Sequence, residues 1–456
     1  MPATKPATDL YPPAPRGVPG DFTRSSPAYQ RRTLAVLAGL FMFLLLYLVL
    51  IAATGYAGWR LAYALPRLSH SDSGAFVFIA SGLVAVFMLL LFLVKGLFKS
   101  QKTDRSHYVA VTRAEQPELF RFIDRVCEET RAPRPAGVYV SPDVNAAVFY
   151  NTSLFNLIVP PRKYLLIGAG LVNAVNLREF KAVLAHEFGH FSQKSLALGT
   201  YVYVANRVLR DIVYGRDSWD DVLRYWCRVD LRLSFPAWAL RAVVWVIRRA
   251  LEQVFKGINL PNLALSRQME FNADDVAVSV AGSDAIVGAL CRIEFADRCH
   301  ALTARELSAA ADLGLHSRDI FHHQRRAAAH LRAAGGKPDM GVPPAPPARV
   351  FDPGDASDVP QMWRSHPRNS DREANAKRHY LPADDDGRSP WLLFAGREDL
   401  CAKLSAAFYP ARQAGRRRRP RGPRPGPGLH RRRTGGNPIR PEIPWSVRRT
   451  GAPSRS

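Results

Sequence analysis

The residues with the clearest chemical potential are five in succession, His186-Glu187-Phe188-Gly189-His190. The polar residue Asn176, followed by apolar residues, predicts a helix that contains them. On a helix the two histidines lie on one face about one turn apart, where both can bind a single zinc ion. Glu187, beside the first histidine, can accept a proton from a water that the zinc activates. The motif therefore predicts one zinc ion per chain and hydrolysis assisted by that ion.

A third protein ligand is expected downstream, because two histidines and a water leave one zinc position to fill. The best candidate is Glu270, about 80 residues after His190, in a segment with a helical pattern. On a helix Glu270 and Asp274 face the same way, so one can bind zinc while the other orients a ligating imidazole. Two histidines and one glutamate are typical of a catalytic zinc site. For Glu270 taken alone, a solvated surface acid is the alternative interpretation.

Two long uncharged stretches near the N-terminus predict membrane-spanning helices. Residues 33–58 and residues 74–94 contain no charged side chain. At about 1.5 Å per residue, helices of this length match or exceed the roughly 30 Å of hydrocarbon in a bilayer. Core helices of a soluble protein are the alternative, but such helices rarely run beyond 20 residues or so without a charge. Basic residues outside the pair outnumber those between the two stretches, which places both ends of the pair on the cytoplasmic side.

The rest of the chain predicts a mainly α fold with a small β-sheet. Apolar spacing predicts helices at 117–131, about 261–281 and 284–302, and strands at 138–140, 146–149, 155–159 and 164–167. Residues 235–251 are apolar but contain Arg241 and end near Arg248-Arg249. This favours an interfacial or buried helix, and a further span stays open as the alternative.

Charge and cysteine usage limit the classes of function. The chain has 63 Lys and Arg against 39 Asp and Glu, a net charge of +24, and residues 411–456 alone hold fourteen Arg and one acid. This Arg/Pro-rich tail is expected to be disordered, and three interpretations stay open: an arm on anionic lipid, a non-specific nucleic-acid arm, or a sequence read out of frame. No specific nucleic-acid partner is expected, because Trp445 is the only Phe, Tyr or Trp after Tyr409. Five scattered cysteines without a C-x-x-C pair suit a reducing compartment.

The order of these elements resembles the membrane zinc metallopeptidases of the HtpX and CAAX prenyl protease family. The likeness rests on the two apolar N-terminal stretches, the strand-rich stretch, the motif at 186–190 and the pattern Arg267-x-x-Glu270-x-x-Ala273-Asp274. The resemblance implies an N-terminal transmembrane helical hairpin followed by a zincin-type (gluzincin) metallopeptidase domain. We expect a polar leader at 1–32, the hairpin at 33–98, the peptidase domain at 105–334 and 363–410, a linker at 335–362, and the tail.

The resemblance also implies roles for individual residues. It implies that Glu187 is the catalytic base and that the zinc ligands are His186, His190 and Glu270. Asp274 is implied as a supporting or proton-handling residue. The strand near Asn145-Ala146-Ala147 is implied to line the cleft and to pair with the backbone of a substrate, as an edge strand can.

One late element also resembles the family, namely His366-Pro367 followed by Arg372. A role in steadying the oxyanion is one interpretation of this element, and a plain loop histidine is the other.

These features predict a membrane-anchored zinc endopeptidase that hydrolyses peptide bonds. We expect a multi-pass protein of the cell (inner) membrane with the catalytic domain facing the cytoplasm. Its partners would be the lipid bilayer and peptide or protein substrates, membrane proteins among them, in quality control or peptide processing. The alternative is a membrane-anchored scaffold or inactive homologue with a structural zinc site. Glu187 argues against that alternative, because a structural site has no use for a base beside its ligand.

Overall fold

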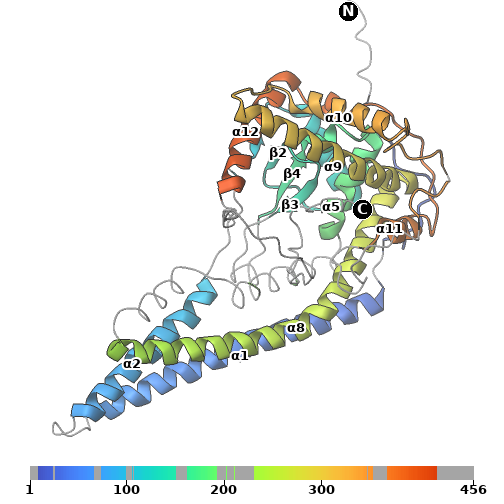
Figure 1. The fold of residues 1–456 in the computed structure, drawn as a ribbon. Coiled ribbons are helices and arrows are strands. Elements are labelled where there is room, and N and C mark those ends of the chain that lie inside the picture. The colour runs from blue at the N-terminus through green and yellow to red at the C-terminus, as the bar shows by residue number, and fades with distance from the viewer. Residues whose placement is uncertain are drawn as a thin grey trace, which may run out of the picture.

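A small sheet packed among helices forms the upper part of the molecule, and three long helices extend from it (Figure 1). The computed structural model describes residues 9–23, 26–65, 73–98, 105, 107–149, 162–192, 202, 210, 231–346, 348–352 and 367–417. Most of the described chain is helical, as the sequence predicts.

The sheet has four strands in the order β1-β2-β4-β3, namely β1 (Val109–Val111), β2 (Val138–Ser141), β4 (Tyr164–Gly168) and β3 (Ala146–Phe149). The pairs β1–β2 and β3–β4 are antiparallel, whereas β2 and β4 are parallel. The strands predicted at 138–140, 146–149 and 164–167 are confirmed, and the one predicted at 155–159 lies outside the described residues. In the part of the chain that the structure describes, β3 is an edge strand.

The core lies between the sheet and four helices, which are α3 (Pro117–Thr130), α4 (Ala169–Val172), α5 (Leu177–Ser192) and α9 (Ser283–Asp312). Buried apolar side chains of β2 and β4 meet those of α3 and α5, including Val140, Leu165, Phe122 and Phe180. The predicted cap of α5 is confirmed. Asn176 N–H donates to Glu179 Oε2, and Glu179 N–H donates to Asn176 Oδ1, both at 2.8 Å. These reciprocal bonds satisfy donors at the start of the helix and fix where it begins.

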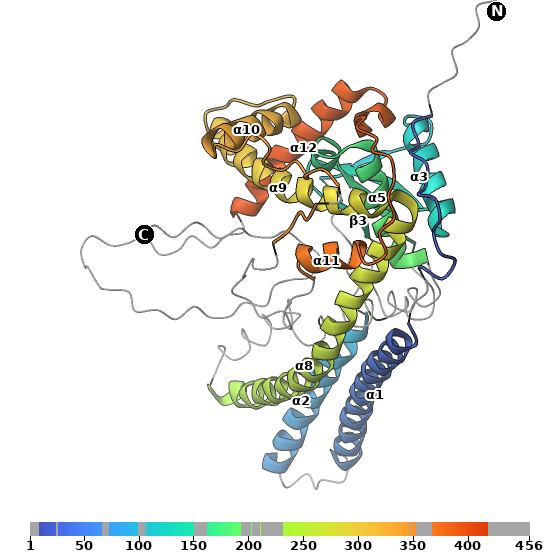
Figure 2. The ribbon, with the colours of Figure 1, turned by 90° about the vertical axis from the view of Figure 1, so that its right-hand side faces the viewer.

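Further helices complete the domain around this core (Figures 1 and 2). They are α10 (Ile320–Ala334), the short helix α11 (Asn369–Ala376), the 3₁₀ turn η4 (Pro390–Leu393) and α12 (Arg397–Arg417). Buried residues of η4 and α12, among them Trp391, Leu393 and Leu404, belong to the same apolar cluster as the sheet. The domain around the sheet therefore draws on residues far apart in the chain.

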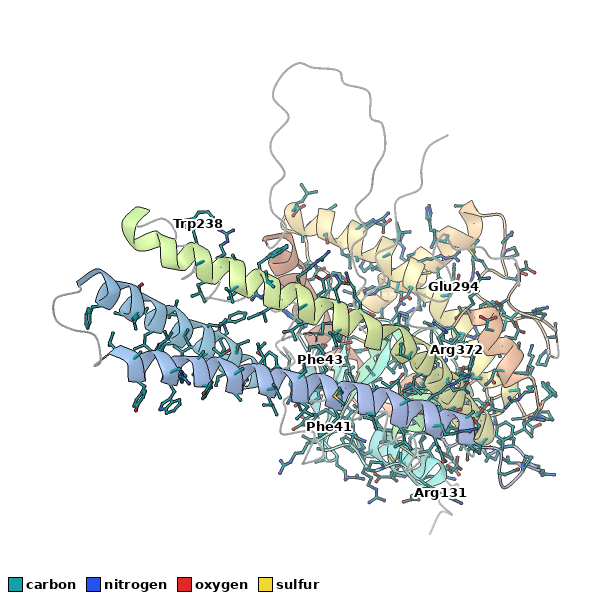
Figure 3. All side chains as sticks on the ribbon, turned by 90° about the horizontal axis from the view of Figure 1, so that it is seen from below. Phe41, Phe43, Arg131, Trp238, Glu294 and Arg372 are labelled. Atoms are coloured by element: carbon teal, nitrogen blue, oxygen red, sulfur yellow. The ribbon has the colours of Figure 1, made fainter. Side chains whose placement is uncertain are left out.

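The long helices α1 (Pro27–Ala64), α2 (Ser73–Phe98) and α8 (Leu231–Ala281) run together away from the sheet (Figures 1 and 2). Tyr47 of α1 donates its hydroxyl to the carbonyl of Leu93 in α2 at 2.7 Å. Phe43 is 1% exposed and faces α8, whereas Phe41 on the outer side of α1 is 67% exposed (Figure 3). An apolar surface of this kind on paired helices is unusual in contact with water.

Helix α8 differs from the prediction, because one continuous helix replaces the two that were expected on either side of Pro261. Proline lacks an N–H, which normally ends or kinks a helix. Leu251 and Phe255 before Pro261, and Leu265 after it, are all buried in one apolar cluster with α1. Packing on both sides of the proline therefore keeps the helix continuous, and Figure 1 shows that α8 bends along its course.

Among the described helices, α1 is the one that is long and apolar enough to cross a membrane by itself. Among the described residues of α2, the stretch Ile79–Lys95 counts as a shorter apolar helix and not as a span by itself. The predicted pair of spans is therefore supported by structure only in its first member.

An unexpected feature is the segment of residues 9–23, which we call the N-terminal strap. It packs on the domain although the sequence predicts only a polar leader there. Tyr11 is 5% exposed and its ring lies 5.0 Å from that of Phe122 in α3. Farther along the strap, Phe22 lies 6.2 Å from the ring of His379, shortly before α1 begins at Pro27. The strap thus connects α3 and α5 to the start of α1 (Figure 2).

A first prediction concerns Gly168, the last residue of β4. A Cβ there would collide with the backbone oxygens of Asp143 and Asn145, and Gly168 N–H donates to Asn145 O at 2.7 Å. The loop that leads into β3 is therefore held directly against this glycine. We expect Gly168→Ala to cost about 1–3 kcal/mol, because backbone must move to admit the methyl group. Thermal unfolding of the purified protein measures the loss.

The matched control is Gly387→Ala, where a Cβ would meet nothing within 4 Å. It should leave the unfolding temperature nearly unchanged. Equal unfolding temperatures for the two variants would contradict the close approach at Gly168.

Candidate metal centre

The predicted ligands come together where α5 crosses α8. His186 and His190 extend from α5 and Glu270 from α8, and one ligand atom from each lies within 4.8 Å of the others. His186 Nε2 is 3.4 Å from Glu270 Oε2, and His190 Nε2 is 4.0 Å from Glu270 Oε1. All three side chains are buried. One site therefore forms from two residues one turn apart on α5 and a third residue about 80 positions later in the chain.

The donor set fits zinc in kind and in spacing. Two imidazole nitrogens and a carboxylate oxygen are ligands that zinc takes in catalytic sites. Ligand atoms about 2.0–2.1 Å from a tetrahedral ion lie about 3.3–3.5 Å apart. The separation of 3.4 Å between His186 and Glu270 meets this requirement, and the 4.0 Å between His190 and Glu270 is close to it.

Asp274 and Arg372 lie behind His186, on the side away from Glu270. His186 Nδ1 is 2.9 Å from Asp274 Oδ1, which leaves Nε2 directed at the ligand cluster. Arg372 from α11 holds both oxygens of Asp274, with Nε donating to Oδ2 at 2.9 Å and Nη2 to Oδ1 at 2.5 Å. Asp274 and Arg372 therefore fix the orientation of His186. Arg372 contacts the carboxylate of Asp274, so its clearest role is to hold Asp274 in place.

The charges around the cluster favour a cation. Burial alone would lower the pKa of His186, but its contacts with Asp274 and Glu270 outweigh burial and raise the pKa to about 9. Burial lowers the pKa of His190 to about 4. Burial alone would raise the pKa of Asp274, but the Arg372 guanidinium keeps that pKa below its usual range. The site thus combines neutral imidazole at His190 with acidic groups that stabilise positive charge.

Glu187 lies between the ligand cluster and the edge strand β3. Burial raises the pKa of its carboxyl to about 7, while the nearby His186 acts in the opposite direction. The backbone of Val148 in β3 also acts on this carboxyl and, like His186, lowers its pKa. Ala146 and Ala147 belong to β3 as well, and Asn145 directly precedes the strand. The residues expected to line a cleft therefore lie on the strand that contacts Glu187.

Helix α11 positions Arg372, and two hydrogen bonds hold this helix in place. Asn375 Nδ2 donates to Asp275 Oδ1 of α8 at 2.9 Å, and Asn369 Nδ2 donates to Glu294 Oε2 of α9 at 3.2 Å. These two bonds hold α11, and with it Arg372, between α8 and α9 (Figure 3). His366, the other residue expected near Arg372, lies outside the described residues. Sequence reasoning missed Asn375 and Val148, because neither carries a motif of its own.

A second prediction concerns Gly189, which lets α5 and α8 approach closely. A Cβ there would lie 3.1 Å from Ala273 Cα and 3.2 Å from the carbonyl oxygen of Ala273. Gly189→Ala should therefore separate the helices slightly at the point where His190 and Glu270 meet. Because a metal site tolerates only about 0.5 Å of displacement, we expect zinc affinity to fall by roughly tenfold while the fold is retained. Competition with a chelator of known affinity measures the change.

Gly257→Ala is the matched control, since a Cβ at this position of α8 would meet nothing within 4 Å. It should bind zinc like the unmodified protein. Undiminished affinity in the Gly189→Ala protein would contradict a tight crossing at the site.

Comparison with known proteins agrees with this site. A model of peptidase family M48 matches residues 113–379. Protease HtpX of Tolumonas auensis is 26% identical over 247 residues, which cover 50% of this chain and 75% of the relative. A protease HtpX homolog of Ligilactobacillus salivarius is 23% identical over 283 residues, which cover 59% of this chain and 82% of the relative. No solved structure gives a significant match.

The region matched by the family model spans more than half of the chain and contains the motif of α5, Glu270 and Arg372. Because both the family match and the arrangement of the side chains point the same way, the chain belongs to peptidase family M48 and is a protease.

Proposed function

We propose that the protein is a membrane-anchored zinc endopeptidase. The observation that carries this proposal is the meeting of His186, His190 and Glu270 beside the carboxyl of Glu187. Three protein ligands with an adjacent acid are the arrangement that catalytic zinc sites use, whereas structural sites surround the ion with four protein ligands. The site belongs to a member of a peptidase family, which makes peptide bonds the expected substrate.

The catalytic steps follow from what each side chain can do. Zinc held by His186, His190 and Glu270 would polarise the scissile carbonyl and lower the pKa of the attacking water. Glu187 accepts the proton of that water and passes it to the leaving amine. Asp274 keeps the proton of His186 on Nδ1, so that Nε2 stays available as a ligand. Arg372 holds Asp274 in the orientation this requires.

The substrate is proposed to bind as an extended peptide along β3. An edge strand can pair with the backbone of another chain, and such pairing depends little on side chains. Residues Asn145, Ala146 and Ala147 would provide these backbone groups, and the contact between Val148 and Glu187 would place the scissile bond near the base. This mode suits an enzyme that cleaves many different protein segments.

Helices α1 and α2 support the proposal that this protein is anchored in a membrane. The apolar side chains on the outer side of α1 are suited to lipid, among them Phe41, Met42 and Val49. The strap before α1 packs on the same domain as the chain after α2. A chain that leaves a domain and returns to it crosses the membrane an even number of times, which supports α1 and α2 as a pair of spans.

The location and role are proposed from charge and from the relatives. Basic residues flank the helix pair on the side of the domain, which supports a catalytic domain that faces the cytoplasm from the cell (inner) membrane. The relatives of Tolumonas auensis and Ligilactobacillus salivarius are called protease HtpX or its homolog. We infer that this chain likewise cleaves proteins, with membrane proteins or particular peptides as substrates.

The test is zinc-dependent proteolysis by the purified full chain in detergent. Cleavage of casein, or of the protein itself, should stop when a chelator removes zinc and return when zinc is added back. Cleavage that continues in full without metal would refute a zinc peptidase. A well-folded protein that holds zinc and cleaves nothing would favour the scaffold or inactive homologue instead.

A further inference from the structure

The strap is held by a concentrated set of contacts around Tyr11. The Tyr11 ring packs on Phe122, whose ring in turn lies 5.8 Å from that of Phe180 in α5. Two cations face the same ring, with Arg125 Cζ 4.0 Å and Lys181 Nζ 4.3 Å from its centre. Tyr11 therefore fills a position in the core that the domain itself leaves to the strap.

Two buried cations of α5 use carbonyl groups of the strap as acceptors. Lys181 is 0% exposed, and its Nζ donates to Pro12 O at 2.9 Å and pairs with Glu129 at 2.7 Å. Arg178 is 4% exposed, and its Nη1 donates to Pro13 O at 3.0 Å. Burial lowers the pKa of Lys181 to about 8, although Glu129 acts in the opposite direction. A buried cation that loses an acceptor is costly, so α5 depends on the strap.

Contacts of Asp9, at the start of the strap, fix where the strap lies on the domain. Asp9 pairs with Arg125 of α3 at 2.9 Å, and its carbonyl accepts from Arg388 Nη1 at 3.0 Å. The strap therefore touches α3, α5 and the segment before η4 at once. The segment before η4 also contacts the N-terminal end of α5, where Leu177 N–H donates to Arg388 O at 2.8 Å.

The same helix, α5, carries two of the three proposed metal ligands, His186 and His190. His186 follows Lys181 by five residues and Arg178 by eight, so the strap contacts the first half of α5 and the zinc ligands occupy the second. At its other end the strap leads directly into α1, which starts at Pro27 with Ser26 as its cap. The strap is thus continuous in sequence with the proposed membrane-anchoring helix and packs, through non-covalent contacts, on the helix that carries His186 and His190.

We propose that the N-terminal strap is a separable segment that docks between α3 and α5, and that its docking keeps α5 in the position that zinc binding requires. The segment that occupies this docking site is residues 9–23 of the same chain. The second half of this inference rests on the proposed zinc site, whereas the docking itself does not. Loss of the strap would remove its contacts with Lys181 and Arg178 of α5 without altering any proposed zinc ligand.

The experiment separates the strap from the folded full chain. A recognition site for a sequence-specific protease is inserted between Arg24 and Ser25, and the purified protein is cut in detergent. The cut strap should remain bound through gel filtration, and an excess of synthetic peptide with the sequence of residues 9–23 should displace it. Removal of the strap should lower the unfolding temperature by roughly 4 °C or more and speed the loss of zinc to a chelator. Added peptide should restore both.

Peptide variants give the matched comparison. A Tyr11→Ala peptide should bind at least about tenfold more weakly, because it loses the buried ring. An Arg16→Ala peptide is the control, since Arg16 is an exposed residue of the same segment. It should bind like the unmodified peptide. The full-length Tyr11→Ala protein, uncut, should show a similar drop in unfolding temperature.

Each outcome bears on one half of the inference. Equal binding of the Tyr11→Ala and unmodified peptides, or a strap that leaves without lowering the unfolding temperature, would overturn the docking. A docked strap whose removal leaves zinc retention unchanged would overturn its link to α5. If even the uncut protein holds no zinc, the proposed function fails, while peptide binding and unfolding still decide the docking.

Discussion

The Glu187→Gln protein is expected to keep its zinc and to lose peptide hydrolysis by about a thousandfold, which is within the range that a general base contributes. Glutamine has nearly the same shape as glutamate, and Glu187 is not among the three predicted ligands. The glutamine side chain cannot accept a proton from the attacking water, however, so this water would no longer be activated. Zinc content by atomic absorption and cleavage of casein, measured on the same preparation, check the two halves of this expectation.

Glu118→Gln is a matched control for this variant. Glu118 is a half-exposed residue in the first turn of α3, where it pairs with Arg121. Its replacement should leave both zinc content and hydrolysis near those of the unmodified protein. Hydrolysis at the original rate by the Glu187→Gln protein would remove Glu187 from the mechanism.

Local patterns in the sequence predicted much of the domain correctly. The amphipathic spacing over 117–131 corresponds to α3, and the short apolar runs correspond to β2, β3 and β4. The capping pattern at Asn176 correctly marks the start of α5. Such features depend on residues a few positions apart, whose hydrogen bonds and periodicity leave a direct trace in the sequence.

The ligand cluster was predictable for a similar reason. His186 and His190 are neighbours on one helical turn, so their spacing alone places them together. Glu270 needed a second helical pattern, and the structure brings it within reach of both histidines. The partner of Arg372 was not predictable from spacing, because Asp274 lies 98 positions away and is reached only through α11.

Tertiary packing explains what the sequence did not reveal. Pro261 indicated a helix boundary, yet buried residues on both sides keep α8 continuous. The strap was expected to be a polar leader, since its many prolines and scattered charges show no period. Tyr11 is the residue that ties it to the core, and one aromatic side chain in such a segment gives no sign of what it will contact.

The Glu270→Ala protein is expected to lose its zinc, and with it all peptide hydrolysis. Glu270 is the only predicted ligand on α8, so its removal leaves two histidines of a single helix to hold the ion. The chain should still fold, because removal of a buried acid among acidic neighbours leaves α5 and α8 packed through their apolar residues. Zinc per chain, measured after dialysis against a weak chelator, should be near one for the unmodified protein and near zero for the variant.

Asp274→Asn separates the role of a ligand from that of a supporting residue. Asp274 contacts His186 Nδ1 and Arg372 but is not among the three clustered ligands. Loss of such a hydrogen-bond partner costs roughly 10–100-fold in metal affinity, so this variant should bind zinc measurably but more weakly. Glu270→Ala should lose more than this, because it removes a bond to the ion itself. If the two variants bound zinc equally well, Glu270 would be a supporting acid and the third ligand would have to come from another residue.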